Sequence, residues 1–116
     1  MKLEVGMYVK TKNGYICKII NINDYREPNM KYGIEANYLR DIMFIGDNDI
    51  AKASYNIIDI LEVGDYVNGV KVINIDDEWI IMSDMQVPIL KSIANGMIKS
   101  VITYEQMERM AYKVGE

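Results

Sequence analysis

The chain has 116 residues, a formal charge of −4, 50% hydrophobic and 26% charged residues, no histidine and one cysteine. This length and composition are typical of a small globular protein and exclude a large multidomain enzyme. The missing histidines exclude the usual general base near neutral pH and His-containing metal sites, and a single cysteine excludes an intramolecular disulfide and a Cys-only zinc cluster.

An internal repeat organises the chain. The segment LEVGMYV at residues 3–9 returns as LEVGDYV at residues 61–67, with six identities in seven. A second block follows in the same order, because KIININD at residues 18–24 matches KVINIDD at residues 71–77. Two ordered matches indicate a duplicated unit. We therefore expect two domains, residues 1–58 and residues 59–116.

The first copy reads as short strands separated by turn residues. Asn13-Gly14 favours a type I′ hairpin turn, since both residues tolerate a positive φ. We expect strands over residues 7–11, 15–22, 30–35 and 38–45, a loop over residues 23–29, and a turn over residues 46–49 that closes a hairpin onto a strand over residues 50–54.

The second copy repeats this pattern and ends in a helix. Asn68-Gly69 again marks a hairpin, and strands are expected over residues 66–67, 70–75, 78–83, 86–93 and 97–102. Thr103 and Gln106 stand at capping-box spacing, which predicts a helix over residues 104–111 with Tyr104, Met107, Met110 and Ala111 on its buried side. The corresponding place in the first copy, residues 54–58, predicts a single helical turn.

These elements predict a mainly β protein, and the start of each copy resembles a known small fold. Residues 5–9, followed by Gly14 and the apolar residues 16–20, resemble the opening of SH3-like small barrels of the KOW and Tudor types, as do residues 63–67 followed by Asn68-Gly69. The resemblance implies two tandem SH3-like small β-barrels, with the short helix at the C-terminal end.

The whole chain, with its duplicated LEVG segments and its YKVGE end at residues 112–116, is also similar to small proteins encoded by bacteriophages and prophages. That similarity implies an accessory gene product, a class that includes inhibitors of host defence systems such as anti-CRISPR proteins. No functional residue can be carried over from it.

No residue pattern indicates catalysis, so we expect no enzyme and no cofactor. The serines have no histidine to activate them, and no glycine-rich phosphate loop is present. The run Asp47-Asn48-Asp49 lacks the glycine and distant glutamate of an EF-hand and is interpreted as a polar turn. Cys17 is expected in the core, and Trp79, in an apolar run, in the core or between the domains.

Charge and aromatic residues divide unequally between the copies. Residues 1–58 carry a charge of +1 (eight basic and seven acidic residues), whereas residues 59–116 carry −5 (five basic and ten acidic). Interleaved aromatic and basic side chains in the first copy can stack on bases and touch phosphates, or form a protein hot spot. The candidate partner-binding residues there are Tyr15, Tyr25, Arg26, Lys31, Tyr32, Tyr38 and Arg40. In the second copy they are the acidic cluster Asp76, Asp77 and Glu78.

The function expected is therefore that of a non-catalytic interaction protein that binds a host macromolecule, with a counter-defence inhibitor as its narrower form. A host protein is the expected partner, and a homodimer is left open. The alternative is a module of the first copy that binds RNA or single-stranded DNA. Charge and glycine at the start of the chain argue against a signal peptide, and no apolar run approaches the length of a membrane span. We expect a cytoplasmic protein, in the host cytoplasm if a phage encodes it, with no membrane partner.

Overall fold

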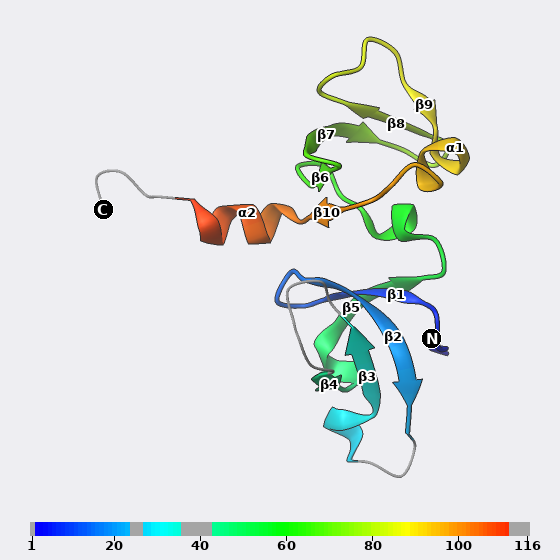
Figure 1. Cartoon of the computed structure of the whole chain (residues 1–116), viewed down its shortest axis with the longest axis vertical. Helices are drawn as coiled ribbons and strands as arrows, with labels where there is room; N and C mark the ends of the chain where they lie inside the picture. The colour runs from blue at the N-terminus through cyan, green and yellow to red at the C-terminus, as the bar shows by residue number, and fades with distance from the viewer. Residues whose placement is uncertain (1, 24–26, 36–42, 112–116) are drawn as a thin grey trace. The chain divides into compact units, whose positions relative to one another are not determined.

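The computed structural model describes residues 2–23, 27–35 and 43–111 (Figure 1). The chain divides into two compact units, Met1–Ile60 and Leu61–Glu116. The boundary between them lies two residues after the predicted division at residue 58. Both units are rich in short antiparallel strands.

The first unit contains one five-stranded antiparallel sheet in the order β4-β3-β2-β1-β5. The expected hairpin between residues 38–45 and 50–54 is wrong, because the strand at residues 50–54 pairs with β1 at the opposite edge from β4. The elements are β1 (Tyr8–Thr11), β2 (Ile16–Ile22), the 3₁₀ turn η1 (Pro28–Met30), β3 (Tyr32–Glu35), β4 (Met43–Ile45), η2 (Asp47–Asp49), β5 (Ile50–Ser54) and η3 (Ile57–Ile60).

The second unit has the same strand order, β10-β6-β7-β8-β9. The strand expected over residues 86–93 is too long, because a helix follows directly after Leu90, and of the strand expected over residues 97–102 only Val101–Ile102 forms. The elements are β6 (Tyr66–Val67), β7 (Val70–Ile75), β8 (Trp79–Met82), β9 (Ile89–Leu90), α1 (Lys91–Asn95), β10 (Val101–Ile102) and α2 (Tyr104–Met110).

The expected helix near the end of the chain is confirmed, but its expected buried side is wrong. Thr103 and Gln106 form the capping box, with the Gln106 N–H donating to Thr103 Oγ1 at 3.2 Å and the Thr103 N–H donating to Gln106 Oε1 at 2.9 Å. Tyr104 is 51% exposed and Met110 is 72% exposed. The capping-box residues therefore predicted the position of the helix correctly, whereas the spacing of its apolar residues did not predict which side chains are buried.

The structure shows two antiparallel sheets, and the prediction of closed SH3-like barrels is not met by the strand pairing. Among the described residues, no pairing joins β4 to β5 or β9 to β10. The coarser prediction, a mainly β protein with a short C-terminal helix, is confirmed.

The two copies of the repeat form equivalent backbone hydrogen bonds. The Gly6 N–H donates to the Ile19 carbonyl at 2.8 Å, and the Gly64 N–H donates to the Val72 carbonyl at 3.0 Å. Both glycines have a φ of 97°, which L side chains rarely adopt. The identical LEVG segments are thus explained by a turn that needs glycine at its last position.

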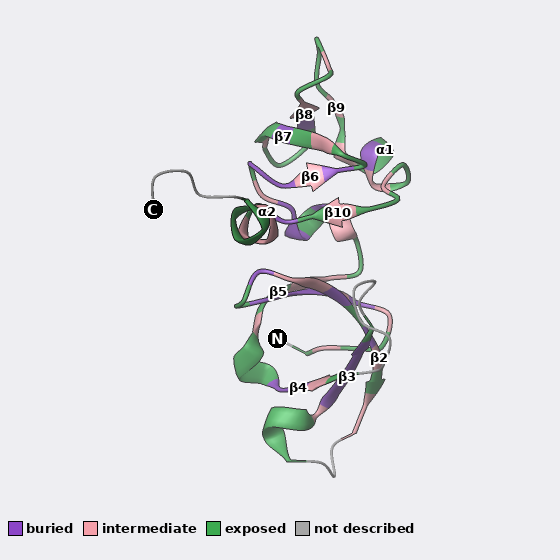
Figure 2. Ribbon diagram, turned by 60° about the vertical axis from the view of Figure 1, so that its left-hand side comes forward, coloured by how far each residue is buried: buried purple, intermediate pink, exposed green. Residues whose placement is uncertain are grey.

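A core of buried apolar side chains holds each sheet. In Figure 2 the buried residues follow the strands of the first unit, whereas η1 and η2 are exposed. Val9 and Ile19 have no exposed surface, and burying a side chain of this size stabilises the fold by roughly 1.5–3 kcal/mol. Cys17 belongs to this core with 2% exposure, as expected. In the second unit, Val67, Val72, Ile80 and Ala94 are buried.

The two Asn-Gly pairs form different hairpin turns. Asn68 has a φ of 52° and Gly69 a φ of 83°, which confirms the predicted type I′ turn. In the first copy only Gly14, with a φ of 90°, has the left-handed conformation. There the Thr11 N–H donates to the Tyr15 carbonyl at 2.8 Å, so three residues form the loop and the prediction of a type I′ turn is wrong.

Asn68→Ala is expected to lower the free energy of unfolding by about 1 kcal/mol, because alanine adopts a positive φ poorly and loses the side-chain bonds of asparagine. Asn68 Oδ1 accepts the N–H groups of Lys99 and Ser100 at 2.8 and 3.1 Å. Urea unfolding checks this. The matched control is Asn13→Ala, at the equivalent position without a positive φ, and an equal loss from both variants would contradict the explanation.

Candidate interaction surface

The aromatic and basic residues predicted to bind a partner are only partly placed by the structure. Tyr25, Arg26, Tyr38 and Arg40 lie outside the described residues. Tyr15 is half-buried and packs against the first core, and Lys31 is half-buried. Tyr32 is 3% exposed and belongs to the core itself. The described members of this set therefore do not present an exposed ring on which a base could stack.

Tyr32 has a structural role in the first unit. Its hydroxyl donates to Asp47 Oδ1 at 2.5 Å, which joins β3 to η2. Burial, and then the bond to the Asp47 carboxylate, raise the pKa of Tyr32 above its ordinary value. Lys31 Nζ lies 5.5 Å from the centroid of the Tyr32 ring, within cation–π distance. Tyr32 therefore contacts the core and η2 of its own unit.

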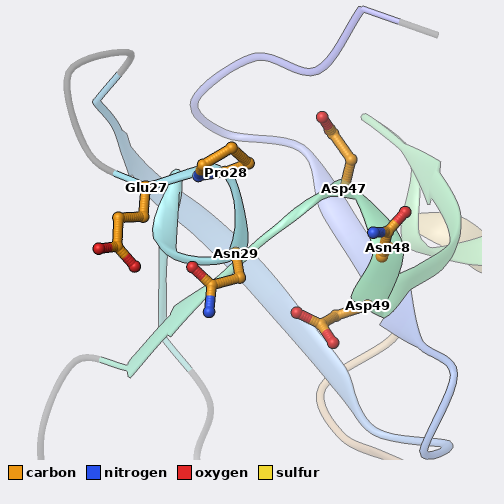
Figure 3. A pocket seen from close by; sticks show the side chains of 6 residues that line it. All are labelled: Glu27, Pro28, Asn29, Asp47, Asn48 and Asp49. Carbon is orange, nitrogen blue, oxygen red and sulfur yellow. The ribbon is translucent and has the colours of Figure 1, made fainter.

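A hollow between η1 and η2 carries three carboxylates, and they do not converge (Figure 3). The side chains of Glu27 and Asp47 point away from one another. Asp47 accepts the Tyr32 hydroxyl, and Asp49 Oδ2 accepts the Gly46 N–H at 3.0 Å. Within residues 2–23, 27–35 and 43–111, no three acidic or cysteine side chains gather closely enough to hold a metal ion. We interpret Asp47 and Asp49 as turn-stabilising residues.

The acidic residues of the second unit form an exposed, ordered turn between β7 and β8. Asp76 Oδ1 accepts the Trp79 N–H at 2.7 Å and the Glu78 N–H at 3.0 Å, and the Asp76 N–H donates to the Trp79 carbonyl at 3.0 Å. These bonds, that of Trp79 first, hold the pKa of Asp76 below its ordinary value. Asp76 thus orders the turn, on which Asp77 and Glu78 are exposed.

The Asp76 carboxyl is expected to titrate below the ordinary aspartate range of about 3.9, since its backbone bonds favour the ionised form. A lowered folded-state pKa means that this turn contributes stability above the unfolded-state pKa and loses it as the pH falls through the folded-state pKa. NMR titration of the Asp76 carboxyl carbon checks this. A titration of Asp76 at or above the ordinary value would contradict the assigned bonds.

Beside this turn, a large aromatic side chain is exposed. Trp79 is 42% exposed, so it is not a core residue; its cross-strand partner Leu90 is 36% exposed. Trp79 lines a hollow of about 360 Å³, at the lower end of the volumes of ligand pockets. The other residues that line it are Asn74, Asp76, Ile80, Ile81 and Pro88. We call Trp79, Ile81, Pro88 and Leu90, together with the acidic turn 76–78, the Trp79 surface.

Sequence reasoning found the acidic half of the Trp79 surface and missed its apolar half. The run Trp79-Ile80-Ile81-Met82 suggests burial on both faces of a strand, yet only Ile80 is fully buried. An apolar patch bordered by carboxylates, on a short strand, can bind a side chain that has a hydrocarbon stem and a cationic end. The Trp79 surface of the second unit is therefore a better candidate binding site than the aromatic and basic residues of the first unit.

Comparison with protein-family models, with curated proteins and with solved structures gives no match. The function must therefore be argued from the residues of the chain itself. In the part of the chain that the structure describes, no helix has the length and apolar character of a membrane span.

Proposed function

We propose that the protein is a non-catalytic interaction protein that binds a basic protein partner through the Trp79 surface. The observation that carries this proposal is the exposed Trp79–Leu90 pair next to an ordered acidic turn. Tryptophan is enriched among the residues that dominate binding energy at interfaces, and exposed carboxylates favour a partner of opposite charge. The charge of −5 on residues 59–116 acts in the same direction.

We further propose that each unit is an SH3-like small barrel. The support is the shared order of five short antiparallel strands, with a short helical segment, η2 or α1, between the fourth strand and the fifth. In this order the fifth strand lies beside the first, which is compatible with a small barrel. A phage or prophage origin and a counter-defence role, in which the acidic unit occupies a basic nucleic-acid channel, remain the narrower form of the proposal.

Trp79→Ala is expected to reduce retention of the partner at least about tenfold, the effect of a hot-spot residue. The measurement is capture on the immobilised full chain from a bacterial lysate, with quantitative mass spectrometry of retained proteins. The matched control is Val63→Ala, an apolar residue of the same unit with 55% exposure that lies outside the Trp79 surface. Retention should also fall in the charge-reversed variant Asp77→Lys/Glu78→Lys.

The same capture distinguishes the alternative function. Binding of RNA or single-stranded DNA by the first unit would appear as retained nucleic acid that is lost on nuclease treatment and falls steeply with salt. The proposed function would be overturned if the wild type retained nucleic acid. It would also be overturned if the wild type and Trp79→Ala retained the same amount of partner protein.

A further inference from the structure

The two units differ in the connection between their second and third strands. In the first unit, residues 23–31 connect β2 to β3 and include η1; in the second, residues 76–78 connect β7 to β8. The strand registers on either side of this connection nevertheless correspond. Both β2 and β7 shift register at the same place in the repeat, between Ile19 and Asn21 and between Val72 and Asn74.

Because the registers correspond, positions in the two sheets can be matched one by one. Tyr32 pairs with Ile45 in the first unit, and Ile80 pairs with Ile89 in the second. The next residue along the chain is Gly46 in the first unit and Leu90 in the second, and each precedes a short helix, η2 or α1. Gly46 and Leu90 are therefore equivalent positions.

In the first unit, η1 covers this position. A Cβ at Gly46 would lie 2.2 Å from the Pro28 carbonyl oxygen and 2.6 Å from the Asn29 Cα, so the η1 backbone lies directly against the glycine. In the second unit no η1 exists among the described residues, and the equivalent Leu90 is exposed together with Trp79 and with Ile93 of α1, which is 57% exposed. The same face is covered in one copy and open in the other.

We infer that a segment of the partner covers this face of the second unit as η1 covers the first: a single helical turn that places an apolar side chain against Trp79 and Leu90. This inference rests on the proposed function and names the part of the partner that binds. The charge expected of the partner segment follows from the turn beside the site, because Asp77 and Glu78 are exposed on that turn. The segment therefore carries lysine or arginine next to its apolar residue.

The inference is tested by selecting from a displayed library of short linear peptides on the immobilised full chain. Selected peptides should combine an aliphatic or aromatic residue with lysine or arginine. Trp79 is the sole tryptophan, so its fluorescence reports on this site alone. A bound peptide should protect Trp79 from quenching by acrylamide. Leu90→Ser keeps the fluorophore and should weaken peptide binding about tenfold, whereas Val63→Ala should not change it.

Peptide-bound NMR data decide the conformation, since a helical turn gives close sequential amide contacts and an extended strand does not. The inference is overturned if the library yields acidic peptides or no peptide. It is also overturned if the bound peptide is extended, or if it binds Leu90→Ser as tightly as the wild type. If Trp79→Ala still abolishes capture of the whole partner, the proposed function stands while the single-turn segment is rejected. Self-association of the chain that Leu90→Ser abolishes would instead identify a second copy as the occupant and also overturn the inference.

Discussion

Replacing Asp65 by alanine is expected to lower the free energy of unfolding by about 3 kcal/mol, because two partly buried backbone N–H groups lose their acceptor. Asp65 has no exposed surface. Its Oδ2 accepts the Glu62 N–H and its Oδ1 accepts the Tyr104 N–H, both at 2.8 Å. One carboxylate thus joins the turn before β6 to the first residue of α2, and its loss should loosen both.

The first copy has a different residue at the position equivalent to Asp65, and this difference allows a comparison. Met7 is equivalent to Asp65 in the repeat, and its sulfur accepts the Glu4 N–H at 3.2 Å. A sulfur is a weaker acceptor than a carboxylate. Asp65→Met should therefore keep the turn better than Asp65→Ala, while still losing the bond to Tyr104.

Urea unfolding measures the free energy, and circular dichroism measures the helix. The matched control is Asp84→Ala, an exposed aspartate of the same unit, which should change the free energy of unfolding by less than about 0.5 kcal/mol. A loss from Asp65→Ala no larger than that from Asp84→Ala would show that the two bonds do not stabilise the unit.

Gly46→Ala is the second change with a large expected effect, again about 3 kcal/mol of destabilisation, which is the upper range for overpacking. The new Cβ would lie 2.2 Å from the Pro28 carbonyl oxygen, and this atom is backbone that cannot rotate away as a side chain does. The substitution should displace η1 from β4 and η2, with which it is in contact.

Gly96→Ala is the control for this change. Gly96 has an ordinary φ of −74°, and the nearest atom to a Cβ there is the Ile93 carbonyl oxygen at 3.7 Å. Urea unfolding should find this variant within about 0.5 kcal/mol of wild type. If Gly46→Ala is equally stable, η1 does not lie against the glycine, and the comparison of the two faces loses its basis.

Local signals in the sequence predicted much of the fold. Asn68-Gly69 predicted the type I′ turn, and Thr103 with Gln106 predicted the start of α2. Each of these depends on contacts within a few residues. Pairing between distant segments was predicted less well, as the position of β5 beside β1 shows.

The predictions that were wrong depend on contacts that a short stretch of sequence does not show. Residues 91–95 contain Ile93, a good strand former, yet they form α1. The register shifts at Ile19/Asn21 and Val72/Asn74 break the simple alternation of inward and outward side chains, so that Ile73 is 52% exposed. The candidate site was predicted only in part, because the exposure of Trp79 depends on the short connection before β8.

That connection has an evolutionary consequence. The two copies keep the same strand order and the same register shift although their second and third strands are joined by connections of different length. In a duplicated gene, shortening or lengthening this one loop uncovers or covers a face of a sheet while the pairing of the strands is preserved. Either copy can therefore change the surface that it presents while the strand order of its sheet stays the same.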